Sequence, residues 1–267
     1  MSALRGAPAR RTRNVLPTVL LIAALLGAWE LYADLSGVQE DVLPAPHAVA
    51  SALWSNWRPV WRNFTVTAEQ VLLGLALALA CGFVLAVAIH LLPLLRRAVY
   101  PLAVGSQAVP IPVIGVPLVL WWGFGIFPKL VVIALICFFP VVVATVDGLA
   151  AVDPEQPKLL RTLDASRWQA FRFAELPAAL PAALSGARIA LAVGVIGAFI
   201  AETSTPSTTA YSGLGREIVT NVSSFQTPRA YAATAVLFAF AVACFYALAL
   251  VERMLIPWRS RPRGWRA

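Results

Sequence analysis

The stretch LLRTLDASRWQAFRFAELPAALP (residues 159–181) carries three arginines, an aspartate, a glutamate and two prolines in a chain that is otherwise mostly aliphatic. It predicts a helix from Ala165 to Ala174 with Asp164 as its N-cap, because an aspartate oxygen can accept hydrogen bonds from open backbone donors. An apolar stripe recurs along it at intervals of three: Ala165, Trp168 and Phe171. Such a helix can dock in a groove of another protein, or lie on a bilayer with its arginines against anionic headgroups.

No pattern for catalysis, nucleotide binding or metal binding accompanies this stretch. The only lysines, Lys129 and Lys158, do not follow glycine, so no phosphate-binding G-x-x-x-x-G-K-[ST] loop exists. No G-x-S-x-G or H-E-x-x-H is found either. The cysteines and histidines are isolated in the sequence: Cys81, Cys137, Cys244, His47 and His90. We expect no enzyme activity, no metal site and no cofactor bound by this chain.

The elements that position the stretch are membrane helices. Of the 267 residues 60% are hydrophobic and 13% are charged, and the mean hydropathy is +0.76, whereas soluble proteins have about 25% charged residues. Six apolar runs approach the roughly 20 residues that cross a bilayer, where only a helix satisfies its own backbone. They lie at 15–33, 67–92, 101–122, 127–149, 180–201 and 229–256. We expect an all-α polytopic membrane protein with six transmembrane helices.

The remaining segments complete the predicted order. They are a basic tail at 1–14, a connection at 34–66 expected outside the cytoplasm, a core membrane domain at 67–256 with a polar loop at 150–179, and a basic tail at 257–267. The first apolar run ends in Trp29, Glu30 and Tyr32 instead of small residues, so we expect a retained anchor and not a cleaved signal peptide.

The net charge of +8 and the pI near 10.1 are explained by how the basic residues are distributed between the two sides of the membrane. With six spans, most basic residues fall on the side of the two tails and the polar loop. The opposite side holds Arg58, Arg62, Lys129, Arg216 and Arg229. By the positive-inside rule both termini are cytoplasmic, and a nucleic-acid partner is not expected.

Ionisable groups within the spans are few, although an ion-coupled carrier would bury several near the bilayer midplane. Glu30, Glu69, Asp147 and Glu202 lie near span ends, and only Arg188 lies inside a span. Arg188 must snorkel or pair, and snorkelling toward the cytoplasm is favoured. If the chain transports a solute, we expect its energy to come from another chain. The alternatives are an ion-coupled secondary carrier and a non-transporting scaffold.

The third span contains Pro101, Pro110, Pro112 and Pro117, and we expect it to line a translocation path or a subunit interface. Four prolines free backbone groups that neighbouring protein or a water-filled cavity must satisfy. Ser106 and Gln107 are polar candidates for this path.

Further candidates for the path or its gate lie near span ends. Trp121, Trp122 and Phe124 predict a gate or stacking surface, or an interfacial aromatic belt. Phe138 and Phe139 are candidates too, although packing is favoured for them. Glu202 is either a solvated helix end or a contact to the outer gate or a binding protein.

Residues 159–181 resemble the EAA loop of bacterial ABC importer permeases. Leu176-Pro177 matches that pattern, while Asp164 stands at the family's glycine, Ala174 at its isoleucine, and Lys158-Leu159-Leu160 at its E-A-A triplet. In the family the glycine permits a left-handed turn. Either the turn here is right-handed with Asp164 as an N-cap, or this branch docks differently.

A series of motifs from about residue 42 to 250 resembles the nitrate, sulfonate and taurine branch, which includes transporters of pyrimidine vitamin precursors. The series comprises Leu43-Pro44-Ala45-Pro46, Gly74, Gly82, Pro110-Ile111-Pro112, Trp121-Trp122-Gly123-Phe124-Gly125, Phe138-Phe139-Pro140, Asp147-Gly148-Leu149, Ala165-Ser166-Arg167-Trp168, Gly186, Glu202 and Gly213-Leu214-Gly215.

This resemblance implies the type I ABC importer permease fold with a cytoplasmic coupling-helix elbow, in a bacterial inner membrane. It also implies a second permease subunit, most simply in a homodimer, an extracytoplasmic solute-binding protein, and an ATPase subunit that uses ATP and Mg. The ATPase would dock on the elbow, whose candidate residues are Arg161, Thr162, Asp164, Ala165, Ser166, Arg167, Trp168 and Phe171. Nitrate, sulfonates, taurine, pyrimidines and riboflavin remain open as solutes, with the aromatic outer end favouring an organic one.

Overall fold

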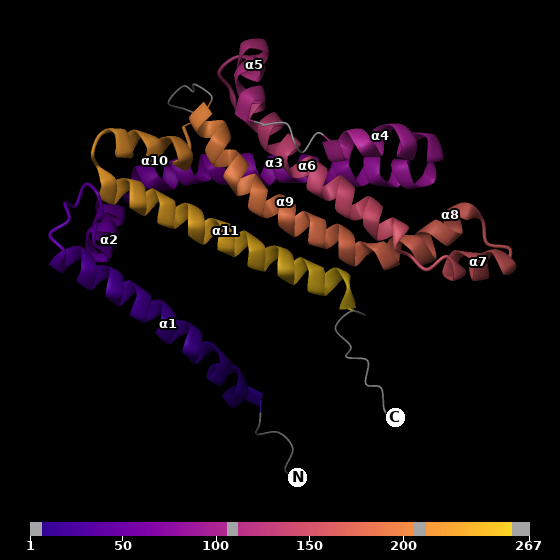
Figure 1. Ribbon diagram of the computed structural model, residues 1–267, viewed down its shortest axis with the longest axis horizontal. Helices are drawn as coiled ribbons and strands as arrows, with labels where there is room; N and C mark the ends of the chain where they lie inside the picture. The colour runs from indigo at the N-terminus through magenta and orange to yellow at the C-terminus, as the bar shows by residue number, and fades with distance from the viewer. Residues whose placement is uncertain (1–6, 106–111, 205–211, 258–267) are drawn as a thin grey trace, which may run out of the picture. The chain divides into compact units, whose positions relative to one another are not determined.

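The computed structural model describes residues 7–105, 112–204 and 212–257 and assigns them to helices and the turns between them. The helices are α1 (Ala7–Leu35), α2 (Pro46–Ser55), α3 (Trp57–Leu91), α4 (Pro93–Gly105), α5 (Pro112–Trp122), α6 (Ile126–Ala150), α7 (Glu155–Thr162), α8 (Arg167–Ala170), the π-helical turn η2 (Phe171–Glu175), α9 (Leu176–Ser204), α10 (Leu214–Ser223) and α11 (Thr227–Leu255) (Figure 1). Within the described ranges, five segments are long and apolar enough to cross a membrane: 16–35, 57–91, 126–150, 167–204 and 227–255.

The predicted third span, 101–122, is not one described helix. Its residues belong to α4 and α5, which have 13 and 11 residues, and residues 106–111 between them lie outside the described ranges. Either helix alone is less than about 20 Å long, whereas the hydrocarbon core of a bilayer is about 30 Å thick. The predicted connection at 34–66 is also largely helical, because α2 lies within it and α3 begins ten residues before the predicted start of the second span.

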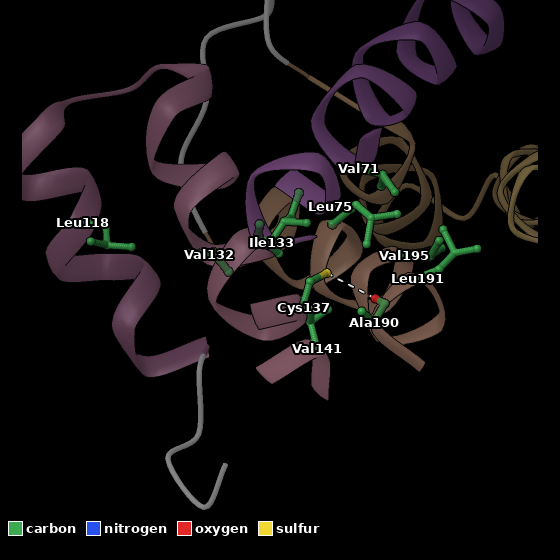
Figure 2. Close-up of a cluster of buried hydrophobic side chains, with 13 residues drawn as sticks. Val71, Leu75, Leu118, Val132, Ile133, Cys137, Val141, Ala190, Leu191 and Val195 are labelled. Carbon is green, nitrogen blue, oxygen red and sulfur yellow. Dashed lines mark hydrogen bonds between the residues drawn. The ribbon is translucent and has the colours of Figure 1, made fainter. Parts of the chain in front are cut away.

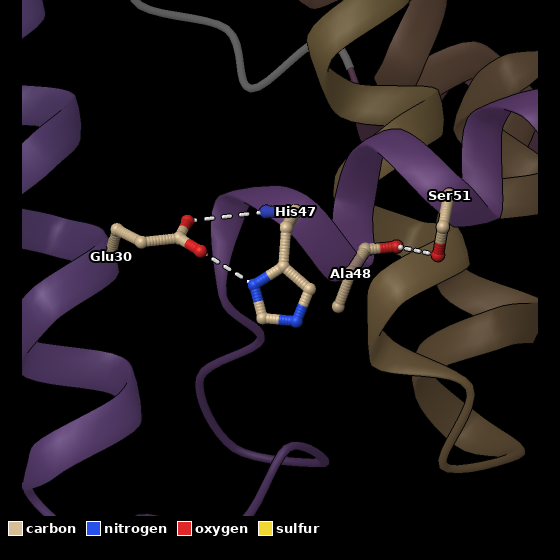
Figure 3. Close-up of polar contacts among 4 residues, drawn as sticks. All are labelled: Glu30, His47, Ala48 and Ser51. Atoms are coloured by element: carbon tan, nitrogen blue, oxygen red, sulfur yellow. Dashed lines mark hydrogen bonds and ion pairs between the residues drawn. The ribbon is translucent and has the colours of Figure 1, made fainter.

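The chain divides into two compact units, residues 1–61 with 217–235, and residues 62–216 with 236–267. In the first unit, the carboxylate of Glu30 on α1 accepts hydrogen bonds from the backbone N–H of His47 at 3.2 Å and from its ring Nδ1 at 2.5 Å (Figure 3). The hydrogen bond to Glu30 raises the pKa of His47 above its ordinary value. This contact joins α1 to the first turn of α2.

The second unit is built on α6 and α9, which pack against each other more extensively than any other described pair. Glycines let the two backbones approach: a Cβ at Gly148 would lie 2.5 Å from the Ala182 Cβ, and one at Gly186 would lie 3.0 Å from the Pro140 carbonyl oxygen. Small residues at such positions are typical of helix pairs in membranes.

Buried aliphatic side chains from α3, α5, α6 and α9 fill the space around this pair (Figure 2). At their centre the Cys137 Sγ donates a hydrogen bond to the Ala190 carbonyl oxygen at 3.2 Å, and its side chain is fully buried. Of the three cysteines, which the sequence suggests are small buried hydrophobes, Cys137 is buried, Cys244 is half-buried and Cys81 is exposed.

Arg188 on α9 pairs with Glu252 on α11, and its guanidinium lies 5.7 Å from the centre of the Phe245 ring. Of the two alternatives considered for Arg188, snorkelling and pairing, the structure shows pairing. Its side chain is only partly buried, and a carboxylate on another helix compensates its charge, because a paired arginine is less costly to bury than an unpaired one. Glu252 was missed, since 64 residues separate the partners.

Candidate functional site

The polar stretch folds into an elbow at one end of the α6 and α9 pair, where α7 follows α6 and α8 leads through η2 into α9 (Figure 1). In α8, Ser166 is the N-cap. Its hydroxyl accepts a hydrogen bond from the Gln169 N–H at 3.3 Å, while its own N–H donates to Gln169 Oε1 at 2.7 Å. This capping box satisfies two donors that a helix start otherwise leaves open.

Asp164 is not the N-cap that the sequence predicted. Its φ is +59°, so it adopts the left-handed conformation. The Ala165 N–H donates to the Leu160 carbonyl oxygen and the Asp164 N–H donates to the Arg161 carbonyl oxygen, each at 3.1 Å. These two bonds are the Schellman pattern that ends a helix, and Asp164 occupies the position in it that usually holds glycine. The elbow therefore has the left-handed turn in spite of its aspartate.

Asp164→Gly is expected to stabilise the chain by about 1 kcal/mol, because glycine has no Cβ to strain a left-handed turn. The measurement is the midpoint of thermal unfolding in detergent, compared with Asp164→Ala, which also removes the carboxylate but keeps the Cβ. A midpoint that falls with glycine, or that rises equally with alanine, would contradict this assignment of strain.

The elbow is fixed by contacts to the C-terminal end of α3. The Arg167 guanidinium donates a hydrogen bond to the Leu91 carbonyl oxygen at 2.8 Å, where an open helix end favours a cation. His90 Nε2 lies 2.7 Å from a carboxylate oxygen of Glu175 in η2. The ring of His90 also lies 6.1 Å from that of Phe171.

Phe171 is buried with Leu149 and Ala179 and is only 2% exposed. The sequence placed Phe171 among the docking candidates with Trp168, but its side chain is not on the exposed surface of the elbow. Residues three apart on an α-helix diverge by about 60°, so Trp168 remains 58% exposed while Phe171 turns into the unit. The two rings still touch, with centroids 5.4 Å apart. The buried ring of Phe171 thus packs against the exposed ring of Trp168.

The exposed large apolar side chains of the elbow, which we call the elbow surface, are Leu159, Leu163, Trp168 and Phe173. Leu159 lies in α7, and Leu163, four residues later, caps the C-terminal end of that helix. Sequence reasoning missed both leucines and Phe173, although the i, i+4 spacing could have indicated the pair. Of the other predicted docking residues, Arg161, Thr162, Asp164, Ser166 and Arg167 are exposed and Ala165 is half-buried.

Aromatic side chains gather at the other end of α6, about 37 Å away along a 25-residue helix. The Trp122 ring meets those of Trp121 and Phe127 edge to face, with centroids 6.1 and 5.1 Å apart. These three rings and Phe124 are all exposed, and Phe127 was not anticipated. The predicted path residues Ser106 and Gln107 lie outside the described residues.

Phe138 and Phe139 lie in α6 and contact each other edge to face at 5.3 Å. Both are partly buried, and Phe138 packs against two hydrophobic clusters of the second unit, while Phe139 packs against one of these two. Their surroundings are those of packing residues, which was the favoured reading of the sequence.

Glu202 is fully buried near the end of α9, so the solvated helix end considered from the sequence was wrong. Its carboxylate accepts hydrogen bonds from the Thr67 hydroxyl at 2.7 Å and from the Gly215 N–H at 2.6 Å. Thr67 Oγ1 in turn accepts from the Leu214 N–H at 2.8 Å. Glu202 and Thr67 therefore cap the first residues of α10, whose open donors favour a negative charge. We call this network the Glu202 clamp.

Two neighbours explain why the clamp is built from these residue types. Gly213 lies so close that a Cβ there would overlap the Glu202 carboxylate. Lys129 on α6 is 1% exposed and its charge acts on Glu202. A buried carboxylate with hydrogen-bond donors and a nearby cation is satisfied within the chain. The clamp holds α3, α9 and the start of α10 together at this end.

Comparisons with known proteins agree along most of the chain. The family described as "Binding-protein-dependent transport system inner membrane component" matches residues 74–258. The formylaminopyrimidine transport permease protein ThiX of Halalkalibacterium halodurans is 31% identical and covers 94% of this chain and 99% of its own. The riboflavin transport system permease protein RibX of Chloroflexus aurantiacus is 31% identical over 92% and 90%. The taurine transport system permease protein TauC of Escherichia coli is 29% identical over 93% and 92%.

A solved structure of an amino acid ABC transporter with histidines has a similar fold. The TM-score is 0.58 at 16% sequence identity, with 75% of this chain and 96% of that chain covered.

Proposed function

We propose that this chain, which belongs to the family of binding-protein-dependent transport system inner membrane components, forms the path through which an ABC importer carries a small planar organic solute. It is a multi-pass inner membrane permease subunit with the type I permease fold. The family implies two kinds of partner, an ABC ATPase subunit and a solute-binding protein.

The observation that carries the solute class is similarity over nearly the whole chain to two permeases named for flat ring compounds, formylaminopyrimidine and riboflavin. Exposed aromatic rings at Trp121, Trp122 and Phe127 support it, because flat rings stack on such surfaces. Taurine, for which a third relative is named, has no ring and gains nothing from stacking.

The orientation follows from charge and from the elbow. Both termini and the elbow face the cytoplasm, where the ATPase is, because basic residues concentrate in these segments. The aromatic rings and the Glu202 clamp then lie toward the binding protein. ATP and Mg are used by the ATPase chain and not by this one.

A second copy of this chain completes the path. Large apolar side chains of α5, such as Val113, Val116 and Leu120, are exposed in a single chain. Proline-rich helices need neighbouring protein or water to satisfy their freed backbone groups. A homodimer supplies that neighbour.

Trp122→Ala is expected to raise the KM for uptake of a pyrimidine up to about tenfold, since an aromatic pair contributes about 0.5–1.5 kcal/mol. Uptake is measured in proteoliposomes that hold the chain with its ATPase and binding protein, with labelled formylaminopyrimidine and labelled taurine offered separately. Trp122→Phe, which keeps a ring, is the matched control and should stay near wild type. Preferential uptake of taurine, or an unchanged KM in Trp122→Ala, would overturn the solute class.

A further inference from the structure

Three metal-ligating side chains meet in the first unit, which contains neither the elbow nor the clamp. One ligand atom from each of Glu30, Asp34 and His47 lies within 4.8 Å of the other two. Glu30 and Asp34 are one turn apart on α1, so both carboxylates lie on the same face of that helix. His47 reaches them from the start of α2, and Figure 3 shows its ring directed at Glu30.

The backbone holds His47 in this place. α2 begins with Pro46, and its N-cap, Ala45, has no side chain that could cap the helix. The Glu30 carboxylate takes over that task by accepting the His47 N–H. Residue 47 is therefore fixed against α1 by its main chain as well as by its ring, which preorganises the imidazole beside the two carboxylates.

Negative charge accumulates around this imidazole. Asp34, Glu40 and His47 line one pocket of about 170 Å³. Among the residues that the structure describes, neither Asp34 nor Glu40 is ion-paired with a lysine or arginine. A bound cation would offset the negative charge of the three carboxylates beside His47, which are Glu30, Asp34 and Glu40.

We propose that Glu30, Asp34 and His47 bind one divalent transition-metal ion, with zinc as the preferred ion. A mixed set of one imidazole nitrogen and two carboxylate oxygens is a zinc ligand set, and three protein ligands leave the fourth position to water. In a tetrahedral site with bonds near 2.0–2.1 Å the ligand atoms lie about 3.4 Å apart. Zinc binding would therefore lengthen the 2.5 Å contact between Glu30 and His47 and bring more widely spaced ligand atoms closer together. Small side-chain rotations would achieve both changes.

Such an ion would join the first helix to α2, since its ligands come from both. Magnesium does not fit, because it prefers an octahedral shell of oxygen ligands and water. The sequence predicted no metal site because His47 is isolated along the chain. The fold, however, brings His47 beside Glu30 and Asp34.

The test is a zinc titration by calorimetry on the full chain in detergent, purified without a histidine tag and stripped with a chelator. Wild type is expected to bind one zinc per chain, and millimolar magnesium should not compete. Asp34→Asn should weaken zinc binding at least about tenfold. This variant keeps the Glu30–His47 contact, because among the described residues the Asp34 side chain makes no hydrogen bond.

Thermal unfolding separates a metal ligand from a merely structural residue. Zinc should raise the unfolding midpoint of wild type and not that of Asp34→Asn, while the two midpoints agree without zinc. His90→Gln removes the other histidine and should leave zinc binding unchanged. Wild type that binds no zinc, or equal zinc binding by wild type and Asp34→Asn, would overturn the site.

Discussion

Trp168→Ala is expected to weaken binding of the ATPase subunit by about 2 kcal/mol or more, roughly thirtyfold, while the chain still inserts in the membrane. Trp168 is the largest exposed side chain of the elbow surface and rests on the buried ring of Phe171. A supported, exposed tryptophan loses little entropy when a partner covers it, which is why such residues dominate interfaces. The measurement is the yield of ATPase that copurifies with the tagged chain.

Trp54→Ala is the matched control, since Trp54 is 88% exposed and lies on α2, outside the elbow. It should leave copurification unchanged. If Trp168→Ala retains the ATPase at full yield while both variants insert equally well, the elbow surface is not the docking site, and a helix lying on the bilayer becomes the better account of these residues.

Glu202→Ala is expected to destabilise the chain by about 3–5 kcal/mol, the range for removing one side of a buried charged network. The change leaves the Thr67 hydroxyl and the Gly215 N–H without their acceptor and takes away the negative charge that acts on Lys129. Each buried polar group that loses its partner adds a desolvation penalty. The unfolding midpoint in detergent and the yield of inserted protein report this loss.

Glu69→Ala makes the same substitution at an exposed glutamate of α3, two residues after Thr67. It should change stability by no more than about 0.5 kcal/mol. If the two variants unfold alike, the Glu202 clamp does not stabilise this end of the unit.

The helical architecture was predictable because membrane spans depend on the composition of continuous segments. α6 and α11 lie where apolar runs were found, and the polar loop does separate α6 from α9. Helix ends were less predictable. α3 begins at Trp57, although the sequence placed residues 57–66 in a connection, because a helix can extend beyond the bilayer.

Within the elbow, the sequence identified the segment but not its local geometry. Asp164 was assigned to the start of a helix, as an aspartate before a helix usually is, yet it ends the preceding one. Ser166, two residues later, takes the capping role because Gln169 follows it at the capping-box spacing. The burial of Phe171 depends on Leu149 and Ala179, which no local pattern reveals.

The clamp and the Arg188 ion pair could not be predicted from spacing. Thr67 and Glu202 are separated by 135 residues, and Arg188 and Glu252 by 64. Only the packing of α3, α6, α9 and α11 brings such partners together. More charge is therefore buried than the sequence indicated, and it is paired within the chain.

We propose that transport through this chain is driven by an ATPase held at the elbow. Solute uptake should be measured in proteoliposomes that contain the chain alone or with its ATPase and binding protein. We expect accumulation only in the complete vesicles, only with ATP, and not with Trp168→Ala. Accumulation in vesicles that hold this chain alone, driven by an ion gradient, would contradict the claim and identify a secondary carrier.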